Sequence, residues 1–143
     1  MLHIAIVIAL FVYTKRADST ILDYILPEQS VCVKGHLACE VASRTTHVRL
    51  VLWDVDNYNP DDQMGESFSD ENGNFNFCGS ARDFSGGVEP ILMVYHRCNV
   101  EADALCYRKL RLQIPISFVG KTYTFWEDID LSTEKDEEGV QCL

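Results

Sequence analysis

The sequence predicts an all-β sandwich of about seven strands. Apolar and polar residues alternate with a period of two over several short segments, and helical periodicity is scarce. Stretches rich in Gly, Pro, Asn and Asp separate these segments, as turns separate strands. The chain has 143 residues, of which 47% are hydrophobic, and it shows no repeat or linker. These values fit one folded domain and exclude a chain that is disordered throughout.

Seven strands follow from this alternation, and each is bounded by a turn signal. Gly35 inside the first strand indicates a bulge or a close approach of another backbone. Asp70-Glu71-Asn72-Gly73 is a strong turn, because Asn-Gly tolerates positive φ. Residues 91–96 are apolar on both faces, which predicts a central strand, and residues 64–69 predict an edge strand. Residues 101–104 predict one helical turn, and residues 134–138 an acidic turn or frayed tail. The predicted strands cover residues 31–39, 48–53, 64–69, 74–78, 91–96, 109–114 and 123–131.

The N-terminal segment is predicted to be cleaved and to lie outside the folded domain. Ile4 to Tyr13 is a nearly continuous apolar run of about ten residues, and a membrane-spanning helix needs roughly 20. Such a run at the N-terminus is typical of a secretory signal peptide, with cleavage expected after Ser19. We therefore expect a signal peptide over 1–19, a secreted domain over 20–143 and no integral membrane segment. The alternative is a buried N-terminal strand.

The cysteines indicate the same extracellular compartment. An even number of cysteines in a small secreted domain predicts disulfides, and six cysteines allow 15 pairings. Zinc sites prefer close pairs such as C-x2-C, but the shortest gaps here are Cys32 to Cys39 and Cys98 to Cys106. Disulfides are therefore favoured over zinc. The six cysteines are Cys32, Cys39, Cys78, Cys98, Cys106 and Cys142.

The charge of the chain excludes one class of partner. The formal net charge is -10, from 12 Lys and Arg against 22 Asp and Glu. Nucleic acids are polyanions, so they are not expected as partners. Binding to anionic lipid would need bridging calcium or a local basic patch, for which Arg108, Lys109 and Arg111 are the candidates.

A series of motifs, taken in chain order, resembles the nematode transthyretin-like family of secreted proteins. The match runs from about Val31 to Cys142. Two departures are Glu40-Val41-Ala42-Ser43, where the family usually has Gly-Lys-Pro, and Cys32 with Cys78, which are additional to the four usual cysteines. The matching motifs are Val33-x-Gly35-x-Leu37-x-Cys39, Val48-x-Leu50-x-Leu52-Trp53-Asp54-x-Asp56, Asp61-Asp62, Asp70-x-x-Gly73-x-Phe75, Gly79, Pro90-x-Leu92-x-Val94-x-His96-x-Cys98, Cys106 with Arg108-Lys109, and Cys142.

The resemblance implies a two-sheet Greek-key β-sandwich like that of transthyretin, and secretion to the extracellular space. Some members of the family are thought to act as extracellular adaptors that recognise cell-surface lipid or receptors. The transthyretin-like topology also implies a disulfide framework of Cys32–Cys78, Cys39–Cys98 and Cys106–Cys142. An alternative with Cys98–Cys106 and Cys39–Cys142 stays open.

No arrangement of residues predicts catalysis or a bound cofactor. The chain lacks a G-x-S-x-G elbow. Relatives of this fold that hydrolyse 5-hydroxyisourate end in Tyr-Arg-Gly-Ser, whereas this chain ends Val140-Gln141-Cys142-Leu143. His96 is interpreted as a hydrogen-bonded structural residue, because no second His or acid lies at a useful spacing. We therefore expect a protein without enzymatic activity.

Two groups of residues are candidates for binding. Asp54, Asp56, Asp61 and Asp62 carry oxygen ligands of the kind calcium prefers, although the same acidic loop is also typical of a solvated turn. The aromatic residues Trp53, Tyr58 and Trp126 are candidates for contact with a partner, and the alternative is packing in the core or at its rim.

Together these features predict a secreted binding or adaptor module for an extracellular protein or cell-surface ligand. The alternative is a carrier of a small hydrophobic ligand in the channel of an oligomer.

Overall fold

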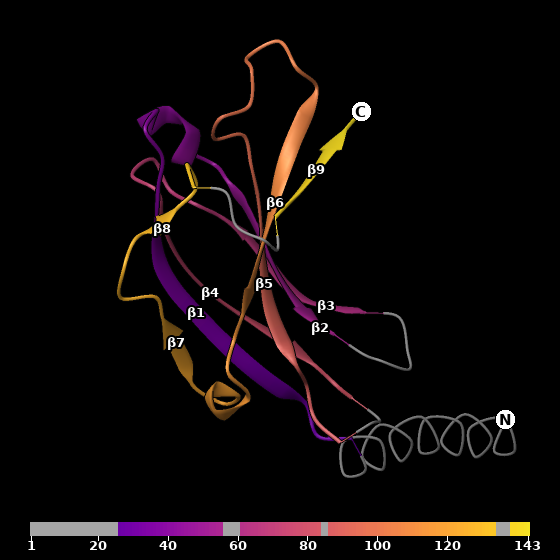
Figure 1. Cartoon of the computed structure of the whole chain (residues 1–143). Helices are drawn as coiled ribbons and strands as arrows, with labels where there is room; N and C mark the ends of the chain where they lie inside the picture. The colour runs from indigo at the N-terminus through magenta and orange to yellow at the C-terminus, as the bar shows by residue number, and fades with distance from the viewer. Residues whose placement is uncertain (1–25, 56–60, 84–85, 134–137) are drawn as a thin grey trace, which may run out of the picture.

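The computed structural model describes residues 26–55, 61–83, 86–133 and 138–143. Their backbone forms two sheets that pack face to face as a sandwich (Figure 1). The predicted signal peptide lies outside the described residues. No helix in the described part of the chain is long and apolar enough to span a bilayer. The strands are β1 (Gln29–Ala38), β2 (Arg49–Asp54), β3 (Asp62–Phe68), β4 (Asn74–Ala81), β5 (Pro90–His96), β6 (Cys106–Gln113), β7 (Thr122–Thr124), β8 (Ile129–Asp130) and β9 (Gly139–Cys142).

The first sheet is built around β1. β4 pairs with it in antiparallel register, with Cys32 opposite Cys78, and β7 and β8 pair with its other edge in parallel register. The sequence predicted a single strand over residues 123–131, but the chain leaves β1 between β7 and β8. Lys34 lies opposite Thr124 and Leu37 opposite Ile129, so three steps along β1 correspond to five steps on the partner side. The two extra residues are forced outward.

The second sheet has the strand order β3-β2-β5-β6-β9. The prediction that 91–96 is a central strand is confirmed, because β5 lies between β2 and β6, and β3 is the expected edge strand. β9 was not predicted; it pairs antiparallel with β6 (Figure 1). Residues 101–104 form a turn closed by the Ala104 N–H and the Glu101 carbonyl, and not a helix. Short 3-10 turns at Ala42–Thr45 and Ile116–Phe118 were not expected.

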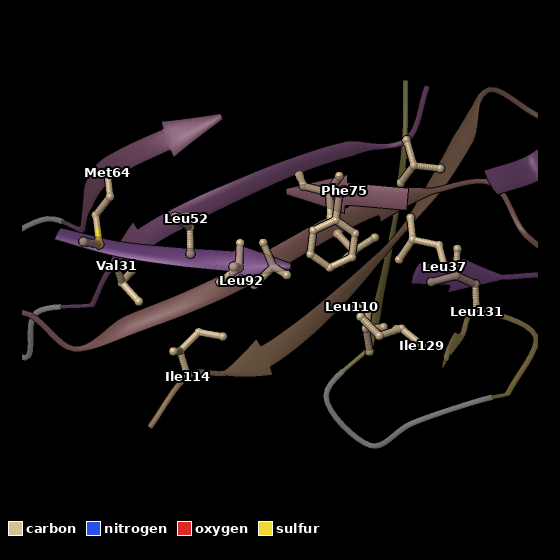
Figure 2. Close-up of a cluster of buried hydrophobic side chains, with 14 of the residues drawn as sticks. Val31, Leu37, Leu52, Met64, Phe75, Leu92, Leu110, Ile114, Ile129 and Leu131 are labelled. Carbon is tan, nitrogen blue, oxygen red and sulfur yellow. The ribbon is translucent and has the colours of Figure 1, made fainter. Parts of the chain in front are cut away.

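The core lies between the sheets and comes from the inward side of each alternating strand. Figure 2 shows Val31 and Phe75 of the first sheet meeting Leu52 and Leu92 of the second. Leu110 and other buried side chains complete the same cluster. Burial of an aliphatic or aromatic side chain contributes about 1.5–3 kcal/mol, so this cluster is the main source of stability.

Glycines allow two close backbone approaches. A Cβ at Gly79 would lie 2.8 Å from the carbonyl carbon of Met64, and a Cβ at Gly65 would lie 2.8 Å from the Cys78 oxygen. These positions bring the edge strands β3 and β4 together and close one side of the sandwich. The predicted turn at 70–73 is present, with Gly73 at φ +83°.

Three disulfides fasten the sandwich, and their pairs are those implied by the resemblance: Cys32–Cys78, Cys39–Cys98 and Cys106–Cys142. The first joins β1 to β4 and the third joins β6 to β9, in each case between directly opposed residues. The second joins the end of β1 to the end of β5 and so links the two sheets. The alternative pairing does not form. Each bridge is expected to contribute about 2–4 kcal/mol by restricting the unfolded chain.

Candidate functional site

His96 lies in a buried polar cluster and not at an accessible site. Its side chain is 0% exposed, and its Nδ1 accepts a hydrogen bond from the Cys98 backbone N–H. The other ring nitrogen, Nε2, therefore carries the proton and donates to Glu138 Oε1 at 2.7 Å. The second oxygen of Glu138 accepts from the Arg108 guanidinium. The cluster connects β5, β6 and the residue before β9.

Burial lowers the pKa of His96, and the hydrogen bond from the ring to Glu138 opposes this effect only in part. The ring is therefore neutral in the folded protein at neutral pH, which agrees with its single Nε2 proton. A buried neutral imidazole with both nitrogens engaged has no free position for a substrate or a metal. Sequence reasoning missed Glu138 because it lies 42 residues from His96. Only the pairing of β9 with β6 brings it near.

Of the acidic residues proposed for calcium, Asp54 and Asp62 lie opposite each other in the β2–β3 pair, but among the described residues they form no cluster of three. Asp54 is buried, and its Oδ1 accepts a hydrogen bond from the Glu89 N–H at 2.7 Å. Asp61 and Asp62 are exposed, and Asp56 lies outside the described residues. In the described ranges no three His, Cys, Asp or Glu side chains are grouped closely enough to hold a metal ion. Asp54 thus holds the backbone beside the β2–β5 pair, and calcium binding stays a prediction.

The candidate aromatic residues occupy separate surfaces. Trp53 is half-buried on the outer face of the five-stranded sheet, whereas the side chain of Trp126 is 90% exposed on the other side of the sandwich. Tyr58 lies outside the described residues. Trp126 owes its exposure to the two extra residues between β7 and β8, which turn the chain outward from β1. The sequence identified the residue, but only the register explains its position.

Trp126 borders an open groove of about 570 Å³, which is the candidate functional site. The groove runs over β1 and β4 to the end of β3, where Phe68 is 53% exposed. In its floor the Phe75 ring packs directly against Gly35, where a Cβ would lie 2.7 Å from the ring. The residues that line the groove are Lys34, Gly35, His36, Ser67, Phe68, Asp70, Asn74, Phe75, Asn76, Thr124, Phe125, Trp126 and Asp128.

His36 fixes the polar side of this groove. Its Nε2 lies 2.8 Å from the Asn72 carbonyl oxygen and its Nδ1 lies 3.0 Å from Asp128 Oδ1. The carbonyl and the carboxylate contact different ring nitrogens, so the imidazole is held on both sides. The ring thereby ties the loop after Trp126 to the 70–73 turn.

Asp70 organises that turn. Its carboxylate accepts backbone N–H groups of Asn74 and Asn72 at 2.9 Å each, and these hydrogen bonds lower the pKa of Asp70. The carboxylate is therefore ionised at neutral pH. The groove thus combines exposed aromatic surface with polar groups held in fixed positions, which suits recognition of a side chain and neighbouring polar groups.

Comparison with known proteins places this fold in a family. The model of the Transthyretin-like family matches residues 34–115, more than half of the chain. The chain belongs to the transthyretin-like family. The matched range includes β1 from Lys34, the strands β2 to β6 and four of the six cysteines, but not Cys32 or Cys142. Both of these belong to bridges between opposed residues of neighbouring strands.

Several relatives come from Caenorhabditis elegans. Transthyretin-like protein 2 is 35% identical over 134 residues, which cover 85% of this chain and 88% of that protein. Transthyretin-like protein 1 is 36% identical over 62% of this chain and 60% of its own length. Transthyretin-like protein 46 is 32% identical over 64% of this chain and 51% of its own length.

Among solved structures, a 9R-lipoxygenase from Cyanothece aligns with a TM-score of 0.44 and 17% identity. The alignment covers 73% of this chain and 16% of that one. This likeness is too weak to support an inference. The assignment to the transthyretin-like family therefore rests on the sequence matches, and the two-sheet sandwich is consistent with it.

Proposed function

We propose that this transthyretin-like chain is a secreted binding module that recognises an extracellular protein through the groove beside Trp126. The observation that carries the proposal is an indole that is 90% exposed next to a groove of about 570 Å³. Exposed apolar residues that gather beside a groove mark interaction sites, and Trp is enriched among residues that dominate interface energies. Phe68 extends the apolar surface on the opposite rim.

The expected partner presents an apolar or aromatic side chain beside polar backbone groups. The apolar side chain would lie between Trp126 and Phe68, while the carboxylates of Asp70 and Asp128 and the ammonium of Lys34 supply charged partners at the rim. The groove presents both acidic and basic side chains. It is therefore expected to select partners by the arrangement of their charged groups and not by their net charge. Catalysis is not part of the proposal, because the lining side chains contain no nucleophile activated by a base.

The extracellular setting is supported by the cysteines. Three disulfides in one small domain are typical of secreted proteins and rare in a reducing cytosol. Expression of the full chain in a secretory cell line should release protein into the medium whose N-terminus begins near Thr20. Retention of residues 1–19 in the secreted product would contradict the cleavage site.

The groove is tested by a change to its most exposed residue. Labelled domain 20–143 is titrated onto intact cells and extracellular matrix, and Trp126→Ala is compared with Leu105→Ala as a control. Leu105 is 68% exposed and does not line the groove. Loss of an aromatic interface anchor typically costs 2 kcal/mol or more, so Trp126→Ala should weaken saturable binding by about thirtyfold.

Unfolding measurements should place both variants within about 0.5 kcal/mol of the parent, since neither side chain is buried. Equal binding by the two variants would refute a role for the groove. Light scattering distinguishes the proposal from the carrier alternative, which requires an oligomer.

A further inference from the structure

A second surface, on the outer face of the five-stranded sheet, differs in charge from the rest of the molecule. Strand register places Arg49, Tyr95 and Lys109 side by side in one row across β2, β5 and β6. The next row holds Val51, Met93 and Arg111, and the third holds Trp53, Ile91 and Gln113. We call these nine residues the cationic face. The chain as a whole has a net charge of -10, whereas these nine residues include three basic ones and no acid; on the neighbouring strand β3, Glu66 lies opposite Val51.

Two of the three cations on this face are held over aromatic rings. The Arg49 guanidinium lies 4.9 Å from the centre of the Tyr95 ring, and the Lys109 ammonium lies 5.9 Å from that of Tyr107. The two rings also pack edge to face, with centres 5.9 Å apart. Such contacts orient the cations without neutralising them. Within the described ranges Arg49 is the one basic residue of the face that is paired with an acid, since it donates to Glu66 at 3.0 Å.

Lys109 and Arg111 have no carboxylate within ion-pairing distance among the described residues. Both project from the same face of β6, two residues apart, so they are separated by about 6.8 Å along the strand. Beside Arg111 lies a hollow of about 290 Å³, lined by Trp53, Asp61, Ile91, Met93, Tyr95 and Arg111. Arg111 therefore borders a hollow that is lined mainly by apolar and aromatic side chains and has an acidic end at Asp61, and Lys109 lies one row away on β6, outside the hollow.

We propose that the cationic face binds an extended acidic segment of a partner protein, with carboxylates at alternate residues followed by an apolar residue. In an extended chain, residues i and i+2 point to the same side and are about 6.8 Å apart, which matches the spacing of Lys109 and Arg111. A side chain at i+4 then lies over Gln113 in the third row, and it reaches the hollow beside Trp53 by leaning across β5. Arg111 can bind its carboxylate through two parallel hydrogen bonds.

Charge argues for a short protein segment and against an anionic membrane. A membrane presents charge over an area much larger than the face, and the remaining surface of this chain is acidic. Ionic screening limits repulsion to about 8 Å at physiological salt, so an acidic segment that contacts only the cationic face avoids most of it. This site shares no residue with the groove at Trp126 and does not depend on the function proposed for that groove.

The test uses two fluorescein-labelled peptides of identical composition. The probe contains Asp-Ser-Asp-Ser-Leu between glycine spacers, and its control contains Asp-Asp-Ser-Ser-Leu, in which the carboxylates no longer share a side. Fluorescence anisotropy with domain 20–143 should show the probe binding about tenfold more tightly than the control. Raising the salt concentration should weaken binding of the probe. Equal affinity for the two peptides, or no binding of the probe, would overturn the proposal.

Two charge-reversal variants locate the site. Arg111→Glu should weaken probe binding by at least about tenfold, while Lys121→Glu, an equal change at an exposed position away from the face, should change it less than about twofold. Trp126→Ala should leave probe binding unaltered. Equal losses in both charge variants would indicate non-specific attraction and overturn the proposal. The proposal would also be overturned by a stronger Arg111-dependent interaction with another ligand. The ligands to compare with the probe are phosphatidylglycerol vesicles, heparin and a second copy of the chain.

Discussion

Glu138→Gln removes the charge that joins β9 to the body of the sandwich. Glu138 is 4% exposed and accepts from both His96 and Arg108, whose side chains are 0% and 12% exposed. A glutamine has nearly the same shape, but it is uncharged. Its amide NH2 group would face the N–H of either His96 or Arg108, so one hydrogen bond is lost. The substitution therefore leaves the Arg108 guanidinium largely buried without its carboxylate.

The expected loss follows from this burial. Breaking a buried ion pair on one side costs about 3–5 kcal/mol, because the remaining charge is not solvated. The chain offers a matched control in Glu66, which pairs with Arg49 at 3.0 Å at the surface, where the side chains are 33% and 42% exposed. An exposed pair contributes about 0–1 kcal/mol, so Glu66→Gln should be nearly neutral.

Urea unfolding under oxidising conditions, followed by tryptophan fluorescence and circular dichroism, measures both variants. With an m-value of about 2 kcal/mol per molar urea, Glu138→Gln should lower the midpoint by roughly 1.5–2.5 M, and Glu66→Gln by less than about 0.5 M. The Cys106–Cys142 bridge keeps β9 attached, so the loss reports the ion pair and not detachment of the strand. Equal midpoints for the two variants would refute the assignment of Glu138 as a buried anchor.

Two further predictions concern the buried histidine and the close approach of β3 and β4. Burial keeps the pKa of His96 below 6.5 in the folded state, so the unfolded chain takes up the proton first. The free energy of unfolding is therefore at its full value above about pH 6.5. Below that pH it falls by up to about 1.4 kcal/mol per pH unit. Unfolding between pH 7.5 and 5.5 should show this slope in the parent, and His96→Gln should reduce it; an unchanged slope would contradict the assignment. Gly79→Ala places a Cβ 2.8 Å from the Met64 backbone and should cost about 1–3 kcal/mol, while Gly139→Ala, whose Cβ has no neighbour within 4 Å, should be neutral or stabilising. Similar thermal midpoints for these two variants would show that β3 and β4 can separate freely at that point.

The parts of this fold that could be predicted from sequence are those specified locally. The 70–73 turn is set by an Asn-Gly pair and an Asp that caps it, and β5 is recognisable because its apolar residues are continuous. β9 gave no such signal, since all four of its residues are exposed and its pairing depends on β6. Its place is set by the Cys106–Cys142 bridge and the Glu138 cluster, which join residues distant in sequence.

The candidate sites show the same limit more sharply. Trp53 and Trp126 are both recognisable in the sequence as possible contact residues, but their assignment to different surfaces depends on strand register. Lys109 and Arg111 alternate with Leu110, so a shared face follows from period two alone. Arg108 lies on the opposite side of β6 and contacts the buried Glu138, so it is not part of the cationic face. The same alternation predicts this position, but only after the inward side of β6 is known.

The position of the two surfaces gives the adaptor hypothesis a physical form. The groove lies over β1 and β4 in one sheet, and the cationic face lies over β2, β5 and β6 in the other, with the buried core between them. They differ in chemistry, since one presents exposed aromatic rims and the other unpaired cations beside a hollow. The two surfaces adjoin where Phe68 of the groove lies opposite Arg49 in the β2–β3 pair, but no residue lines both, so we expect that both can be occupied together. Simultaneous titration of a groove-bound partner and the acidic probe should therefore give independent affinities. Mutual exclusion would mean that the sandwich binds one partner at a time and does not bridge two.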